Sequence, residues 1–515
     1  MAEFPLPQGE SEAEGIGCLC IHCLGKARAR RIGGLTVSAS PLPLSTKLTY
    51  GVGSIAEGVK DAAFRTFLLF YYNQVLGLPG WMGGLAGAVA LIVDAFIDPL
   101  IGSLSDSTRT RWGRRHPYMY AAALPMGIFF FLLFNPPAGL SARGLFAWLT
   151  VFSVLVRAAM ALYSIPSNAM VAELTPHYDE RTSLVGFRYL FGWIGGGFIT
   201  ALAYLWLLAP GGRASDGLRD AAGYAPWSLT GACMIAGAIL LCALGTHRLI
   251  PTLKSPPLGE RFSLRRLEGE VREALGNPSY RTLVVASLFA SVGGAFTDVF
   301  GLYMNTYFWA FTPEQLAAFL PGIVFGVAAG VVSARPISVR FDKRSAALFL
   351  STASVLIGPL PVFLRLAHLT PPNGSAQLLA ALVVQAAFMV ACAVAIGILI
   401  GSMISDTIDQ NELANGTRRE GIFSSAIAFS AKAASGFGTL LAGMSLDLIA
   451  FPRPVPGAPP PEIAAHQATA LGWIVGPGLM GLWLCTLWFL SRYRLTRAEH
   501  ARIVTELAQR AAQSG

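Results

Sequence analysis

The chain has 515 residues, of which 54% are hydrophobic and 13% are charged, and its mean hydropathy is +0.55. This composition excludes the soluble globular classes and is typical of a protein that crosses a membrane several times. The formal net charge of +9 is best explained by basic loops beside anionic lipid, so we expect the lipid bilayer as a partner and no nucleic acid.

The chain opens with a polar extension, residues 1–46, that carries three cysteines. Cys20 and Cys23 have the two-residue spacing of a zinc or redox site, but no second ligand pair follows at a usual distance. We therefore expect no metal and no cofactor. The extension has no long apolar core and no evident cleavage site, so we predict a cytoplasmic leader rather than a signal peptide.

Apolar stretches of about 20 residues, the length that crosses a bilayer, recur roughly twelve times along the chain. They fall near residues 48–72, 83–104, 119–134, 145–171, 184–208, 227–243, 283–308, 316–332, 346–364, 376–403, 421–449 and 470–489. The fold class is therefore an all-α polytopic membrane protein.

A polar, proline-containing segment divides these spans into two sets of about six. The predicted organisation is a bundle at 47–245, a cytoplasmic linker at 246–280, a second bundle at 281–491 and a cytoplasmic tail at 492–515. Apolar residues at helical spacing over 264–275 predict a short amphipathic helix in the linker. Thr496 and Glu499 form a capping-box pattern that predicts a helix in the tail.

Basic residues mark every second loop. Lysines and arginines concentrate in residues 26–31, 109–115, 248–281, 335–344 and 418–419 and in the tail, whereas the alternate loops hold few. By the positive-inside rule, both termini are cytoplasmic and the protein lies in the cytoplasmic (inner) membrane.

Two carboxylates, Asp94 and Asp98, lie four residues apart inside the second apolar stretch. A charge in the membrane costs roughly 2.5 to 3.5 kcal/mol even on the mildest scale, so an intramembrane acid indicates function. Four residues make about one helical turn, so both carboxylates share a face and can converge on one cation. The pair predicts a site for a proton or a monovalent metal cation.

Other charged residues also fall inside predicted spans. Lys432 lies about ten residues inside the eleventh span, where an ammonium needs an anionic partner, and Asp94 or Asp98 from the opposite half is the natural candidate. Such a lysine would couple cation binding to the relative position of the halves. The remaining intramembrane charges are Asp61, Arg65, Arg157, Arg188, Asp298 and Asp447.

Structural roles compete with functional ones for several of these charges. Asp61 and Arg65 have i,i+4 spacing, so they either neutralise each other or leave Asp61 for a substrate. For Arg157 and Asp447, snorkelling or packing is the favoured interpretation.

Acids and arginines also recur together in the cytoplasmic loops of both halves. Paired across a loop, they would form a latch that holds the two bundles closed on one side and releases them on the other. The alternative is that the arginines only set topology. The candidate gating residues are Asp106, Arg109 and Arg114 after the second span, Glu173 and Arg181 after the fourth, and Asp406, Asp409 and Arg419 after the tenth.

Several motifs resemble one known family. The matching segments are residues 47–53 (KLTYGVG), 71–77 (YYNQVLG), 94–99 (DAFIDP), 109–117 (RTRWGRRHP) and 406–409 (DTID). They resemble the glycoside-pentoside-hexuronide:cation symporters, the melibiose permease-like transporters of the major facilitator superfamily, whose fold has two six-helix bundles. The resemblance implies that Asp94 and Asp98 bind the coupling cation, that Arg188 contacts substrate and that Lys432 is the charge partner of the cation site.

The chain also departs from the family pattern. The first-helix aspartate that grips sugar hydroxyls falls on Gly58, with Asp61 as a substitute nearby. A fourth-helix aspartate falls on Ser164, and the tryptophan one turn later falls on Asn168. The asparagine between the paired acids falls on Ile97, and this loss of oxygen ligands favours a proton over sodium.

The sequence therefore predicts a secondary active transporter that moves a sugar or glycoside together with H+ or Na+ by alternating access. Asp61, Asn168, Arg188 and Lys432 are its candidate substrate-site residues. One alternative keeps the fold and changes the solute to an amphiphilic or anionic organic molecule, imported or exported. A second alternative is a membrane receptor that transports nothing. No catalytic nucleophile and base can be identified by spacing, so an enzyme is not expected.

Overall fold

Helices account for the regular structure of the chain, as expected where lipid offers no hydrogen-bond partner and each backbone N–H and C=O group must be satisfied within its own segment. In the computed structural model, the described residues are 42–175, 177–208, 217–252, 272, 275–415, 420–454 and 463–514, and they contain no strand. The three N-terminal cysteines and the predicted linker helix at 264–275 fall largely outside these ranges.

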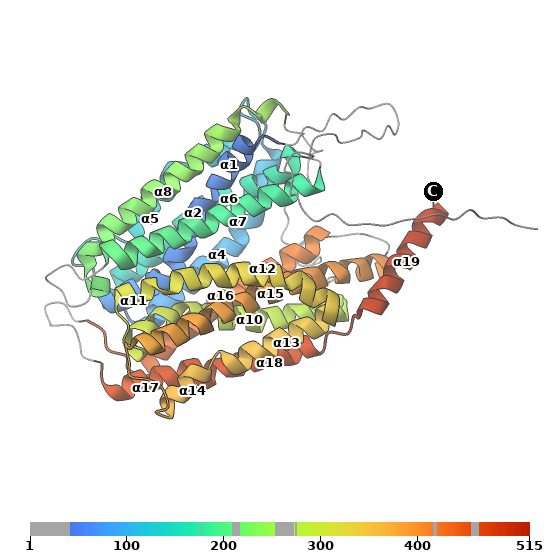
Figure 1. Ribbon diagram of the computed structural model, residues 1–515. Coiled ribbons are helices and arrows are strands. Elements are labelled where there is room, and N and C mark those ends of the chain that lie inside the picture. The colour runs from blue at the N-terminus through green and yellow to red at the C-terminus, as the bar shows by residue number, and fades with distance from the viewer. Residues whose placement is uncertain are drawn as a thin grey trace, which may run out of the picture. The chain divides into compact units, whose positions relative to one another are not determined.

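The first half begins with a segment that alternates α-helix and π-helix over residues 44–75. Long helices follow this segment (Figure 1). Its elements are α1 (Leu44–Val52), α2 (Ser54–Ala62), η1 (Ala63–Phe67), α3 (Leu68–Phe70), η2 (Tyr71–Val75), α4 (Gly80–Ser107), α5 (His116–Leu133), α6 (Ala142–Leu174), α7 (Tyr178–Leu202), η3 (Ala203–Leu207), η4 (Gly217–Arg219), α8 (Ala221–His247) and η5 (Ile250–Thr252).

The second half has the same kinds of element. They are α10 (Pro278–Tyr303), η6 (Met304–Phe308), α11 (Pro313–Ala317), α12 (Phe319–Phe341), α13 (Lys343–Ile357), α14 (Leu360–Leu366), α15 (Ala376–Asn415), α16 (Glu420–Leu448), α17 (Ala465–Trp473), η7 (Ile474–Gly478), α18 (Leu479–Ser491) and α19 (Arg497–Ser514). The tail helix α19 begins as predicted, because the Thr496 hydroxyl accepts from the Glu499 N–H at 3.3 Å.

Ten helical segments among the described residues are long and apolar enough to cross a membrane. The two other predicted spans correspond to the interrupted segment 44–75 and to α16, which packs closely against α4 and α10. The all-helical membrane architecture is therefore confirmed. The boundaries of the two predicted bundles stay predictions, because much of the 246–280 segment lies outside the described residues.

The two halves repeat a local structure at corresponding ends. The first helical segment of each half ends in a five-residue π-helix, η2 and η6. In both, N–H groups of two following residues bond back to the first two carbonyls of the π-helix. A residue with positive φ then turns the chain, Gly77 at 75° and Ala310 at 54°. We call this end of the helices the predicted outer end, because the adjoining loops are poor in basic residues.

The halves meet closely at this predicted outer end along α4 and α16, which lie side by side (Figure 1). Their backbones touch through glycines: a Cβ added to Gly443 would lie 2.2 Å from the Gly80 carbonyl oxygen. Asp447, near the end of α16, accepts hydrogen bonds from the N–H groups of Gly80 at 3.2 Å and Trp81 at 2.7 Å. Its position therefore favours the packing role, since it caps the first turn of a helix from the other half.

A network of neutral side chains joins the halves beside this contact. The Tyr303 hydroxyl donates to Asn73 Oδ1 at 3.0 Å, and the Tyr307 hydroxyl donates to Gln74 Oε1 at 2.7 Å. Gln74 Nε2 in turn donates to Asn73 Oδ1 at 2.7 Å and to the Pro452 carbonyl at 3.1 Å. These amides and tyrosines are largely buried, so the network replaces hydrogen bonds that water would otherwise supply.

Candidate functional site

Farther along the same two helices, an ion-paired cluster joins the halves. Lys432 of α16 places its Nζ 2.9 Å from Asp94 Oδ2 and also bonds to Asp98 Oδ2, both on α4. The spacing of one helical turn brings the two carboxylates to the same ammonium, as the sequence indicated. Asp94 is buried, so the pairing offsets the cost of removing its charge from water.

A guanidinium completes the cluster from the first half. Arg157 of α6 places Nη1 3.4 Å from Asp94 Oδ2, and its guanidinium lies 5.0 Å from the centre of the Phe64 ring. The packing role favoured from sequence therefore does not describe Arg157, whose charge lies at the acid pair. A cavity of about 80 Å³ adjoins these groups, and its lining residues are Lys60, Asp94, Asp98, Arg157, Met160, Ala161, Ser164 and Lys432.

Two further ion pairs involve the interrupted first segment, whose Lys60 lines the cavity. Asp61 pairs with the adjacent Lys60 at 2.6 Å, while Arg65 reaches Asp298 of α10 at 3.6 Å. Asp61 and Arg65 therefore do not pair with each other, and the partner of Arg65 lies in the other half. The i,i+4 spacing was misleading because nearer partners were available to both residues.

Arg188 of α7 lies in a second buried polar cluster. It donates to Glu57 Oε1 at 2.7 Å, to Ser167 Oγ at 2.8 Å and to the Tyr50 hydroxyl at 3.2 Å. The Tyr50 hydroxyl donates to the Ser167 carbonyl at 2.7 Å, which fixes its orientation. Arg188 is therefore held by α1, α2 and α6 of its own half, and its contact with a solute stays a prediction.

Sequence reasoning missed Glu57 and Lys60, although both lie inside the first predicted span. The same signal that singled out Asp61, a charge within an apolar segment, applied to them. Their spacing of three residues also places them near one face of α2. The signal was weak because α2 is polar for a membrane segment, so a single charge in it differs less from its neighbours than a charge in an apolar helix does.

The departure at Gly58 has a steric reason. A Cβ at this position would lie 1.9 Å from the Gly192 carbonyl oxygen on α7, so no side chain fits where the resembling family carries an aspartate. On α6, Ser164 lines the cavity and Asn168 lies one turn later, exposed. Asn168 therefore remains available to a solute, whereas position 58 does not.

Three predicted gating residues of the first half, Asp106, Arg114 and Glu173, form a network within that half. Arg115 pairs with Asp106 at 2.6 Å and with Glu173 at 3.0 Å, and Arg114 pairs with the same glutamate at 2.6 Å. Together they tie α4, the α4–α5 loop and α6. Arg115, which was not among the gating candidates from the sequence, is buried at the centre of this network.

The other two predicted gating residues of this half have different surroundings. Arg181 donates to the carbonyls of Thr175 at 2.9 Å and Ala172 at 3.4 Å, so it neutralises the end of α6. Arg109 is exposed, and no ion pair links it to another of the described residues.

The second half has its own network at the corresponding end. Asp406 of α15 accepts both bonds from Lys343 Nζ, at 2.7 and 2.8 Å, and lies 3.6 Å from His500 of the tail helix. Asp409 lies 3.1 Å from the same histidine. Arg419 falls outside the described residues. In this conformation each of these ion pairs joins elements of the same half. The latch between the two bundles therefore stays a prediction.

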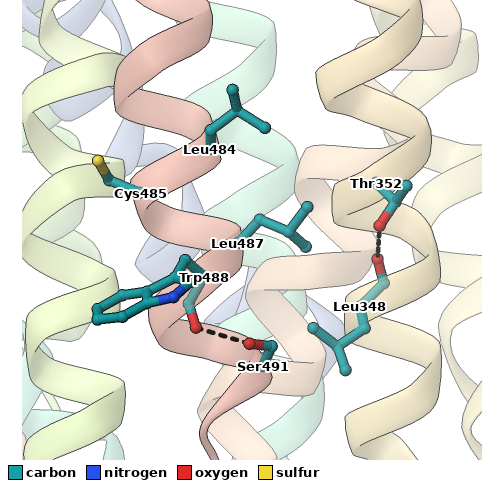
Figure 2. A pocket seen from close by; sticks show the side chains of 7 residues that line it. All are labelled: Leu348, Thr352, Leu484, Cys485, Leu487, Trp488 and Ser491. Atoms are coloured by element: carbon teal, nitrogen blue, oxygen red, sulfur yellow. Dashed lines mark hydrogen bonds between the residues drawn. The ribbon is translucent and has the colours of Figure 1, made fainter.

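A larger groove of about 690 Å³ lies elsewhere, between α13 and α18 (Figure 2). It is lined mainly by apolar side chains, including exposed Leu484 and Trp488. The hydroxyls of Thr352 and Ser491 donate to carbonyls of their own helices, as Figure 2 shows. The groove thus offers little to a polar solute, and the charged cavity at α4 and α16 remains the candidate site.

Comparison with known proteins places this architecture in a family. The sequence model of the family described as MFS/sugar transport protein matches residues 49–497. This chain belongs to the MFS/sugar transport protein family. It is 26% identical to an uncharacterized symporter of Synechocystis, over 92% of this chain and 98% of the relative, and 25% identical to the isoprimeverose transporter of Lactiplantibacillus pentosus, over 79% and 80%.

Solved structures show the same fold. The crystal structure of a D-xylose-proton symporter aligns with a TM-score of 0.59 at 17% identity, covering 88% of this chain and 98% of that chain. As a member of the MFS/sugar transport protein family, the chain is a multi-pass membrane protein and a secondary transporter of a small-molecule solute, and it is not an enzyme.

Proposed function

We propose that this protein is a cation-coupled symporter of a sugar or glycoside in the cytoplasmic membrane, with both termini in the cytoplasm. The observation that carries the proposal is the pairing of Lys432, on the second half, with Asp94 and Asp98 on the first. An ion pair across the moving interface is a contact that a coupling cation can replace. Relatives named as symporters and as an isoprimeverose transporter support the choice of cargo.

The mechanism follows from the charges. With no coupling cation bound, Lys432 neutralises the acid pair and ties α16 to α4. A cation bound at the acids displaces the ammonium and changes which arrangement of the halves is more stable. A solute held between the halves shifts the same equilibrium, so solute and cation each bind better in the presence of the other.

The pairing of the cationic side chains favours a neutral, hydroxyl-rich solute. Arg188, Lys432, Arg157 and Lys60 each have a carboxylate partner among the described residues. An anionic head group would have to displace one of these carboxylates, whereas hydroxyl groups can hydrogen-bond to the ion pairs without separating them. We therefore rank a sugar above the anionic or amphiphilic solute, with Arg188, Asn168 and Asp61 as its candidate contacts.

The proposal is tested by ion movement in proteoliposomes that receive a panel of pentoses, hexoses and their glycosides. We expect at least one sugar to drive uptake of H+ or Na+ by the parent protein and not by Asp94→Asn or Asp98→Asn. Glu506→Gln in the tail helix serves as the control and should behave like the parent. Sugar binding without ion or sugar movement would instead favour a receptor, and movement of anionic amphiphiles alone would favour the alternative cargo.

A further inference from the structure

We propose that Arg157 is a built-in cation that excludes sodium from the acid pair and leaves the proton as the coupling ion. This inference deepens the proposed function and rests on it. It begins with a difference between the two cationic partners of Asp94. Lys432 comes from the other half, whereas Arg157 comes from α6, which packs along α4 within the same half.

The origin of each partner decides what happens when the halves move. Separation of α16 from α4 takes the Lys432 ammonium away from both acids. The Arg157 guanidinium stays, because α6 moves with α4 and because the side chain is fixed against the Phe64 ring and is only 14% exposed. Asp94 therefore keeps a positively charged partner, Arg157, when the halves separate. Asp98 is the only one of the two acids that loses its positively charged partner.

A sodium ion entering this space meets an unfavourable environment. Sodium sites in transporters are built from several oxygens, commonly including unwound backbone carbonyls. Here α4 and α6 are helical throughout the cavity, so most of their carbonyls serve the helices. Pro99 and Pro166 lack an N–H and free the carbonyls of Ala95 and Leu162, but neither residue lines the cavity. Met160 and Ala161 contribute no side-chain oxygen, which leaves Ser164 as the neutral oxygen ligand in the lining.

The charges facing the cavity balance without an added ion. Those on α4 are Asp94 and Asp98, α6 contributes Arg157, α16 contributes Lys432, and α2 contributes Lys60 with its partner Asp61. When Lys432 leaves, one negative charge is left without a partner, at Asp98, so a sodium ion would have a single free carboxylate as its anionic ligand and would lie beside the Arg157 guanidinium, a charge of the same sign. A proton taken from water forms a covalent bond to one carboxylate oxygen and needs no shell of ligands.

The test measures sodium binding directly and requires no solute. We would compare the Tm of the purified protein in about 200 mM sodium chloride and in the same concentration of choline chloride, because a ligand of the folded state raises Tm. The parent should show no sodium-specific shift. Arg157→Ala should gain a shift of about 2 °C or more, which adding Asp98→Asn should abolish.

Two further variants keep the result interpretable. Arg157→Lys retains the positive charge and should show no shift, and Arg157→Gln repeats the neutral change if the alanine variant folds poorly. Arg143→Ala, exposed near the start of the same helix, is the matched control. A sodium-specific shift in the parent that Asp98→Asn removes would overturn the proposal, and so would neutral variants that fold but gain no shift. Neither outcome depends on whether the sugar panel succeeds.

Discussion

Two kinds of contact join the halves at different depths along α4 and α16 or beside them. At the predicted outer end, α4 and α16 touch through glycines, and neutral side chains such as Tyr307 and Gln74 bridge the halves. Deeper in the pair, the same helices are joined by Lys432 and the two aspartates. The first contact depends on shape, and the second depends on charge.

This difference indicates which contact a bound ion can control. A cation cannot compete for a glycine packing surface or for a tyrosine–glutamine hydrogen bond. It can compete for a carboxylate that is paired with an ammonium, because both cations seek the same oxygens. The outer contact should therefore set how firmly the halves close, and the deeper contact should set when they separate.

The largest effect should follow from breaking the charged contact. Lys432→Gln leaves two carboxylates with one fixed cation, so we expect coupled transport to fall by at least about 100-fold and the protein to lose roughly 3 kcal/mol or more of stability. Transport in proteoliposomes and thermal unfolding measure the two effects.

A double variant sharpens this prediction. Lys432→Gln combined with Asp98→Asn removes one charge of each sign, so it should be less destabilised than the sum of the single variants. Strictly additive losses would mean that the two side chains are not coupled energetically.

The shape-dependent contact is broken by adding one methyl group. Gly443→Ala would place its Cβ against the Gly80 carbonyl, so we expect a loss of about 1 to 3 kcal/mol in the free energy of unfolding. Gly397→Ala on α15 is the matched control, because nothing lies within 4 Å of its added Cβ. That substitution should be neutral or slightly stabilising. Equal effects at the two positions would argue against close packing of α4 on α16.

The neutral network should show a smaller effect. Tyr307→Phe removes a hydroxyl that donates to Gln74 and accepts from Arg219, which should favour opening at the predicted outer end by about 1 kcal/mol. A cysteine placed at buried Phe70, beneath the network, should then be alkylated roughly five-fold faster in otherwise cysteine-free protein.

The control for this measurement changes a tyrosine far from the network. Tyr493→Phe alters a hydroxyl that donates to the Met403 carbonyl and should leave the alkylation rate unchanged. An equal rise in rate in both variants would indicate general loosening rather than release of the outer contact.

The smallest effect is expected at Asp447. Its carboxylate caps the first turn of α4 from the other half, and Asp447→Asn keeps an oxygen that can accept one of the two hydrogen bonds. We expect a loss of about 0.5 to 1 kcal/mol, measured by thermal unfolding, with little change in transport. A large loss of transport would instead assign this residue a role in the transport cycle.

Charged residues within apolar segments were the most informative part of the sequence. They identified Asp94, Asp98, Arg188 and Lys432, and they allowed the pairing of Lys432 with the acid pair to be predicted across more than 300 positions, since a lone intramembrane ammonium requires an anion. The same reasoning failed for Arg65, because local spacing offered Asp61 while the structure offered Asp298.

By itself, the sequence determined the helical membrane architecture, the two related halves and the acid pair with its lysine, because lipid imposes strict rules on hydrophobic length and on buried charge. Only the tertiary structure decided that Arg157 shares Asp94, that Gly58 has no room for a side chain and that the described loop ion pairs close within each half. Those outcomes depend on which helices pack together and at what distance, and neither composition nor spacing along one helix specifies the neighbour.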